Sequence, residues 1–150
     1  MTDLQSTLIF VYGLANFILF IRGFHETKNK KNAYGLTPWL LPVGMFAWAD
    51  SISIGIFWTL TSFIALFRDD WILFLLIVSL FWAVRAFGEM TYWFHQQFSS
   101  KNLNPIEKIP WHSIFHDDSV WFFVQTIWQC ILVTTLITSV YLAHLWLRGK

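Results

Sequence analysis

The sequence predicts an all-α integral membrane protein: a bundle of four transmembrane helices with a short interfacial helix before the fourth. Hydrophobic residues make up 56% of the chain and charged residues only 13%, whereas soluble domains carry about 25% charged residues. Four apolar segments reach the length of roughly 20 residues that a helix needs to cross the hydrocarbon core. The alternating pattern of a membrane barrel is absent from the sequence. We therefore expect a single transmembrane domain over residues 1–150.

The boundaries of the spans have chemical reasons. Thr37 and Pro38 are typical of an N-cap and a first helical residue, and Pro42, one turn later, predicts an irregular start to that helix. Aspartates in the 68–70 turn and at Asp117 are expected to cap the helices that follow them. The expected spans are residues 4–24, 38–67, 70–95 and 119–147.

The connection over residues 96–118 is the longest in the chain and contains two prolines. Trp111, Ile114 and Phe115 recur there at helical spacing. An apolar stripe on a short polar segment is typical of a helix that lies on the membrane surface. We therefore expect the interfacial helix in this connection.

The distribution of Lys and Arg predicts the orientation, because cytoplasmic loops carry an excess of both. This excess favours both termini outside a cell (inner) membrane. The sequence has only one cluster of basic residues, and it lies between two apolar spans: Lys28, Lys30 and Lys31. A membrane anchor is therefore favoured over a nucleic-acid site. The lipid bilayer is thus the expected partner, with no nucleic acid. One side carries Arg22, Lys28, Lys30, Lys31, Lys101 and Lys108, and the other Arg68, Arg148 and Lys150.

Charged residues within the spans are the most informative part of the sequence. One charge at the centre of a span costs about 2.5–3.5 kcal/mol, so Asp50, Arg85 and Glu89 are expected to be paired and turned inward. A helix that starts at Pro38 would put Asp50 about 18 Å from the inner end. Arg85 would lie at a similar depth, and Glu89 follows it by one helical turn.

Polar residues of the other helices are expected at the same depth and complete a buried polar layer. The inward stripe of the first helix holds Asn16, and that of the fourth holds Gln125 and Gln129. Tyr92 continues the stripe of Arg85 and Glu89. Such a layer is either hydrogen-bonded contact between helices or a functional site. The candidate residues are Asp50, Arg85, Glu89, Asn16, Gln125, Gln129 and Tyr92.

A metal site is the second candidate. His112 and His116 are four residues apart, the spacing that puts two imidazoles on one helical face, and Asp117 adds a carboxylate. This spacing alone is weak evidence for a metal, because imidazoles at a membrane surface also contact water and headgroups. The sequence identifies no cofactor.

Three functions remain open. The leading interpretation is a small non-enzymatic membrane protein that binds or conducts a small solute or ion at the polar layer. Arg85 would be its anion anchor or counter-ion, with Asp50 and Glu89 as partners or proton carriers. The alternatives are a non-catalytic structural or assembly subunit, as a homo-oligomer or in a larger membrane complex, and a membrane enzyme with a histidine-based metal site.

Overall fold

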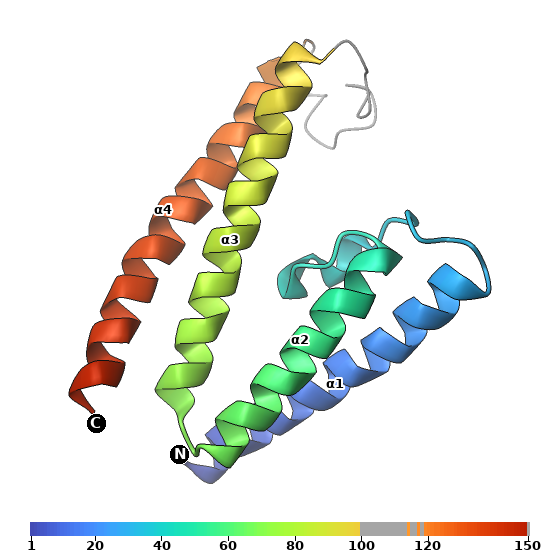
Figure 1. The fold of residues 1–150 in the computed structure, drawn as a ribbon. Coiled ribbons are helices and arrows are strands. Elements are labelled where there is room, and N and C mark those ends of the chain that lie inside the picture. The colour runs from blue at the N-terminus through green and yellow to red at the C-terminus, as the bar shows by residue number, and fades with distance from the viewer. Residues whose placement is uncertain (100–113, 115–116, 118, 150) are drawn as a thin grey trace. The chain divides into compact units, whose positions relative to one another are not determined.

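Four long helices form the structure, as Figure 1 shows. The computed structural model describes residues 1–99, 114, 117 and 119–149. Each of the four is long and apolar enough to cross a membrane, which confirms the expected helical membrane class. The expected interfacial helix lies outside the described residues, apart from Ile114 and Asp117. The elements are α1 (Asp3–Lys28), the 3-10 helix η1 (Pro38–Val43), α2 (Trp48–Phe67), α3 (Trp71–Phe98) and α4 (Ser119–Arg148).

The chain divides into two compact units, Met1–Ile77 and Val78–Lys150. The boundary falls within α3, so the first unit holds α1, η1, α2 and the start of α3. The second unit holds the rest of α3 together with α4.

The first unit is built on close packing between α1 and α2. Gly55 of α2 lies against the backbone of α1: a methyl group added there would meet the carbonyl oxygen of Asn16 and the amide nitrogen of Phe20, both at 3.0 Å. Small residues at a membrane helix interface permit such an approach. Asn16, expected on the inward stripe of α1, is buried there together with Ile9, Gly13 and Gly23.

The start of the second span differs from the sequence expectation. Instead of one helix from Pro38, the chain forms the short η1, which ends at Gly44 with a φ of 80°, and α2 begins only at Trp48. Two prolines in η1 remove backbone donors, and a left-handed residue ends the segment. The helix therefore starts well beyond Pro38.

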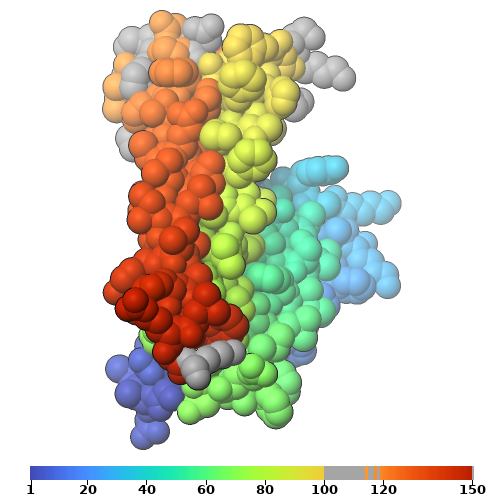
Figure 2. Space-filling view, turned by 60° about the vertical axis from the view of Figure 1, so that its left-hand side comes forward, coloured from blue at the N-terminus to red at the C-terminus, as the bar shows by residue number. Residues whose placement is uncertain are grey.

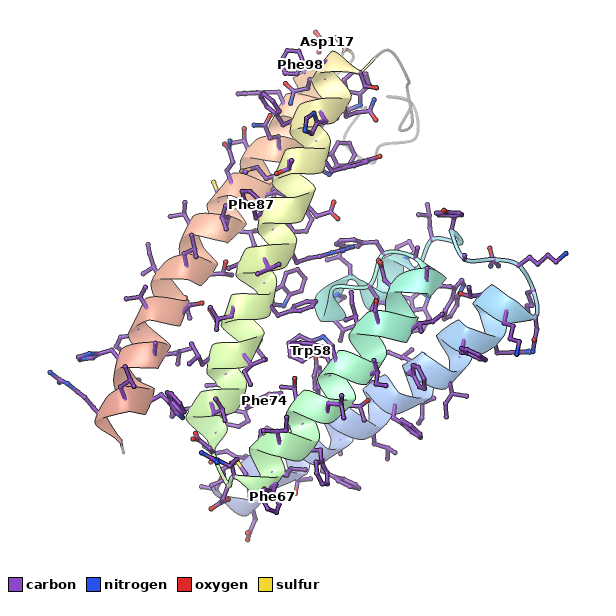
Figure 3. All side chains as sticks on the ribbon, in the orientation of Figure 1. Trp58, Phe67, Phe74, Phe87, Phe98 and Asp117 are labelled. Atoms are coloured by element: carbon purple, nitrogen blue, oxygen red, sulfur yellow. The ribbon has the colours of Figure 1, made fainter. Side chains whose placement is uncertain are left out.

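The loop around η1 folds back on α2. Thr37 and Phe46 are joined by a 2.9 Å backbone hydrogen bond that closes the loop. Trp58, labelled in Figure 3, donates its indole N–H to the carbonyl of Val43 at 3.2 Å. Because Trp58 lies ten residues beyond Trp48, about 15 Å along the helix, this bond indicates that the loop runs back beside α2 rather than away from it.

Aspartates cap the helices as expected. Asp70 Oδ1 accepts the amide N–H of Leu73 at 2.8 Å at the start of α3. Asp117 Oδ1 accepts the amide N–H of Ser119 at 3.0 Å at the start of α4. Each carboxylate satisfies a donor that the first helical turn leaves unpaired and opposes the helix dipole.

In the second unit, α4 runs beside the part of α3 that belongs to this unit, as Figure 2 shows. Ser79 Oγ on α3 donates to the carbonyl of Thr135 on α4 at 2.8 Å. The hydroxyl oxygens of Ser79 and Ser139 lie 3.0 Å apart. These hydrogen bonds, one from a side chain to a backbone carbonyl and one between two hydroxyl groups, fix the register of the two helices.

Candidate functional site

The strongest candidate within the spans is an ion pair on α3. Arg85 and Glu89 are one turn apart, and Arg85 Nη2 lies 3.4 Å from Glu89 Oε1. The side chains are 24% and 20% exposed, so both are largely withdrawn from the surface. Arg85 follows Trp71 by 14 residues, about 21 Å along a helix of 28 residues. The pair therefore lies well inside α3 rather than at its ends.

Two glutamines connect α3 with α4 at the end of the second unit. Gln97 Nε2 donates to Gln125 Oε1 at 2.6 Å and to the carbonyl of Trp93 at 3.2 Å. Gln125 is buried, as is Gln96. The sequence analysis did not predict a role for Gln97. The two consecutive glutamines, Gln96 and Gln97, at the end of an apolar span could have indicated a polar contact with a neighbouring helix.

Two other candidates face outward. Gln129, expected on the same inward stripe as Gln125, is exposed, and Tyr92 is 40% exposed. The ring of Tyr92 contacts that of Trp93 with centroids 5.5 Å apart. Four residues advance an α-helix by slightly more than one turn, so residues near the edge of a stripe can differ in burial.

Asn16 is buried between α1 and α2, with 1% of its surface exposed. Its Nδ2 donates to the carbonyl of Tyr12 at 2.9 Å. Its Oδ1 is buried and has no hydrogen-bond partner among the described residues. An unsatisfied buried acceptor costs about 1–3 kcal/mol, so Asn16 retains an acceptor that a donor group would satisfy.

Asp50 requires a correction to its depth. The sequence estimate counted helical rise from Pro38, but Asp50 lies on the first turn of α2. Its Oδ2 accepts the amide N–H groups of Phe46 at 2.9 Å and Ala47 at 3.3 Å. Asp50 therefore caps α2, and its carboxylate opposes the positive end of the helix dipole.

The candidates thus fall into two groups. Asn16 and Asp50 belong to the first unit, and the remaining members of the expected layer belong to the second. The structure brings Arg85 to Glu89 and Gln125 to Gln97. The pairing of Asp50 with Arg85, and a single layer drawn from all four helices, stay predictions.

Two residues of the expected metal site, His112 and His116, lie outside the described residues. The third, Asp117, is exposed and serves as a helix cap. Among the residues that the structure describes, no group of three or more His, Cys, Asp or Glu side chains has the geometry to hold a metal ion.

An open groove lies on the α1–α2 pair. Its volume is about 210 Å³, and its lining includes Phe10, Gly13, Phe17 and Phe63. None of the polar-layer candidates lines it. Such a surface suits an acyl chain or an apolar side chain rather than an ion.

Comparison with known proteins adds no assignment. No protein-family model matches the chain, and no curated protein or solved structure is significantly similar to it. The chemistry of the described residues is therefore the basis for the functional proposal.

Proposed function

We propose that this chain is a small multi-pass membrane protein that binds or conducts a small solute or ion at the polar layer centred on Arg85 and Glu89. The observation that carries the proposal is the ion pair inside α3, a helix apolar enough to cross the membrane. Ionisable residues within spans are costly, and they typically mark substrate, ion or proton pathways. Arg85 is the proposed anion anchor, and Glu89 its counter-ion and proton carrier.

The helical rise of α3 supports this assignment. From Trp71, about 21 Å of helix leads to Arg85 and about 27 Å to Glu89. The hydrocarbon core is about 30 Å thick. If α3 enters the core near Trp71, Arg85 is embedded in the inner half and Glu89 lies close to the inner interface. This order permits proton exchange at Glu89 while Arg85 stays within the core.

The other polar candidates complete the proposed layer. Gln125 and Asn16 are buried amides, and the Oδ1 of Asn16 offers an acceptor. Asp50 is proposed as a second partner of Arg85 in addition to its capping role. In this proposal both termini lie outside the cell (inner) membrane, supported by the excess of Lys and Arg in the expected inner loops.

Ion flux through reconstituted protein tests the proposal. Liposomes containing the protein should release chloride or take up protons faster than empty liposomes, as followed by dyes sensitive to each ion. Arg85→Gln should remove this difference, whereas Arg85→Lys should retain part of it, because Lys keeps the charge but not the planar donor geometry. Val84→Ala, at a position 74% exposed on the same helix, is the matched control and should leave the flux unchanged.

The result that would contradict the proposal is also defined. The proposal that the site binds or conducts an ion would be excluded by two results together: wild-type flux equal to that of empty liposomes, and no stabilisation of the purified protein by chloride. A ligand that binds only the folded protein raises its free energy of unfolding by an amount that grows with the logarithm of the ligand concentration relative to Kd.

A second candidate function, an assembly subunit, is favoured by the surface of α4. Gln129 is exposed about one third of the way along α4, a helix apolar enough to cross a membrane. Its amide has no hydrogen bond within the described part of the chain. Amide side chains in lipid favour association with a partner helix, and Cys130, also exposed, lies beside it. Disulfide cross-linking through Cys130 in native membranes, lost from the Cys130→Ala variant, would identify a second copy or another subunit at this face.

A further inference from the structure

An arginine near the end of α1, with its cation over two tryptophan rings, forms a second polar feature, remote in sequence from Arg85. The guanidinium carbon of Arg22 lies 5.0 Å from the ring centroid of Trp48 and 5.8 Å from that of Trp39. The two indole rings are 6.1 Å apart and nearly perpendicular, at 67°. The distances from Arg22 to the two ring centroids are within the range of cation–π attraction, and Trp is the strongest aromatic partner for a cation.

The loop around η1 holds these rings in place. Trp48 is only 8% exposed, and its amide N–H donates to the carbonyl of Gly35 at 3.1 Å. Trp39 lies in η1 and is 58% exposed. One ring is therefore fixed in the protein, and the other forms an accessible wall.

The hydrogen-bond donors of Arg22 are not used within the described residues, where it forms neither a hydrogen bond nor an ion pair. Because the two indole planes differ by 67°, the planar guanidinium can lie parallel to at most one of them. Its five N–H donors lie in the plane of the group, and two of them match two oxygens of a phosphate or carboxylate.

The surrounding charge is also suited to an anion. Glu26 is the only acidic residue in the last turns of α1; Lys30 Nζ lies 2.7 Å from its Oε1, and the charges of Arg22 and His25 also act on it. Lys28 is exposed nearby, with its ammonium group 5.4 Å from the ring of Phe24. This end of α1 therefore keeps a net positive charge.

The position of Arg22 near the end of a membrane-spanning helix indicates that the anion is a lipid headgroup. Arg22 precedes Lys28, the last residue of α1, by six residues, which is about 9 Å of helix. Arginine with tryptophan at the end of a span is typical of the headgroup region. Ile18 and Ile21, 57% and 53% exposed, continue an apolar surface toward the bilayer core.

We propose that Arg22, Trp39 and Trp48 form a binding site for the phosphate of an anionic phospholipid. The phosphodiester accepts hydrogen bonds from the edge of Arg22, and the acyl chains lie along the apolar surface of α1. A zwitterionic lipid binds more weakly, because its choline cation offsets the charge of its own phosphate and is repelled by the positive charge at this end of α1. Polybasic segments next to a span attract anionic lipids for the same electrostatic reason.

Lipid-dependent stability and lipid retention test the site. The full chain is purified in detergent, and its thermal stability is measured with added phosphatidylglycerol, phosphatidylcholine or inorganic phosphate; retained lipid is measured by native mass spectrometry. Wild type should be stabilised by phosphatidylglycerol and should retain it in preference to phosphatidylcholine. Arg22→Gln should lower this preference about tenfold, as expected for loss of a charge-assisted bidentate contact.

Matched variants separate a site from general electrostatics. Lys28→Gln removes the same charge without touching the indole rings and should retain most of the preference. Trp39→Leu keeps every charge but removes a wall of the site and should lose part of it. Equal losses for Arg22→Gln and Lys28→Gln would overturn the proposal, as would equal stabilisation by inorganic phosphate, which would identify a free-anion site instead.

Discussion

The side chains of Gln97 on α3 and Gln125 on α4 are joined by a 2.6 Å hydrogen bond, which links residues 28 positions apart in the sequence. Gln125 is buried, so its amide has little access to any other partner. Replacing either glutamine by leucine leaves the other amide short of a partner in an apolar setting. Hydrogen bonds between membrane helices typically contribute about 0.6 kcal/mol and at most about 1.7 kcal/mol.

We therefore expect Gln125→Leu to destabilise the protein by about 1 kcal/mol. The double variant Gln97→Leu/Gln125→Leu should be more stable than the sum of the single effects predicts, because no orphan amide remains. Thermal unfolding in mild detergent measures all three variants. Strict additivity would show that the two amides do not interact.

The close packing of α1 and α2 predicts a contrast between glycines. Gly55→Ala adds a methyl group 3.0 Å from backbone atoms of α1, which cannot move without separating the helices. We expect a loss of about 1–3 kcal/mol, as for other overpacked interfaces. Gly88→Ala is the control, because a methyl group there meets nothing within 4 Å; the higher helix propensity of Ala should make it neutral or stabilising by up to about 1 kcal/mol. The same stability for both variants would contradict the packing of α1 on α2.

The capping role of Asp50 predicts a graded effect. Asp50→Ala removes the acceptor for two backbone N–H groups and should cost about 0.5–2 kcal/mol. Asp50→Asn keeps one acceptor oxygen and should cost less. Circular dichroism melting in detergent measures this difference, and equal losses for the two variants would show that capping is not the main role of Asp50.

The proposed pairing of Asp50 with Arg85 makes a separate prediction. Combining Asp50→Asn with Arg85→Gln should recover part of the loss of the single variants, with a coupling of about 0.5–3 kcal/mol. Glu89 softens the effect, because it also contacts Arg85. Additive losses would exclude the pairing and leave Asp50 as a helix cap alone.

The proposed orientation is tested by labelling. In a Cys130→Ala background, a cysteine introduced by Asn29→Cys, at the end of α1, should react with an impermeant reagent only from the cytoplasmic side. A cysteine introduced by Arg68→Cys, in the turn after α2, should react only from outside. The reverse pattern in intact cells would invert the topology.

Hydropathy predicted the four apolar helices because span length and composition are properties of each segment alone. The first residue of α2 was harder to predict from the sequence, because Pro38 suits the first turn of an α-helix and a 3-10 segment equally well. That choice alone moved Asp50 from mid-helix to the first turn. Contacts such as Arg22 with Trp39 and Trp48 depend on how the loop around η1 folds back, and no local pattern specifies that path.

The central claim, a polar layer inside the membrane that a solute can reach, requires water access at the level of Arg85. In a Cys130→Ala background, the cysteine introduced by Glu89→Cys lies one helical turn from the positive charge of Arg85. Val84→Cys is the control on the same helix, at an exposed position expected to face lipid. The measurement is the rate of modification by anionic and cationic thiosulfonate reagents in membranes.

We predict that the Glu89→Cys variant reacts, and reacts faster with the anionic than with the cationic reagent, whereas the Val84→Cys variant reacts with neither. The preference should disappear when Arg85→Gln is added, since the attraction depends on that charge. A folded Glu89→Cys protein that neither reagent modifies would show that water does not reach the ion pair, and it would contradict the proposed solute or ion site.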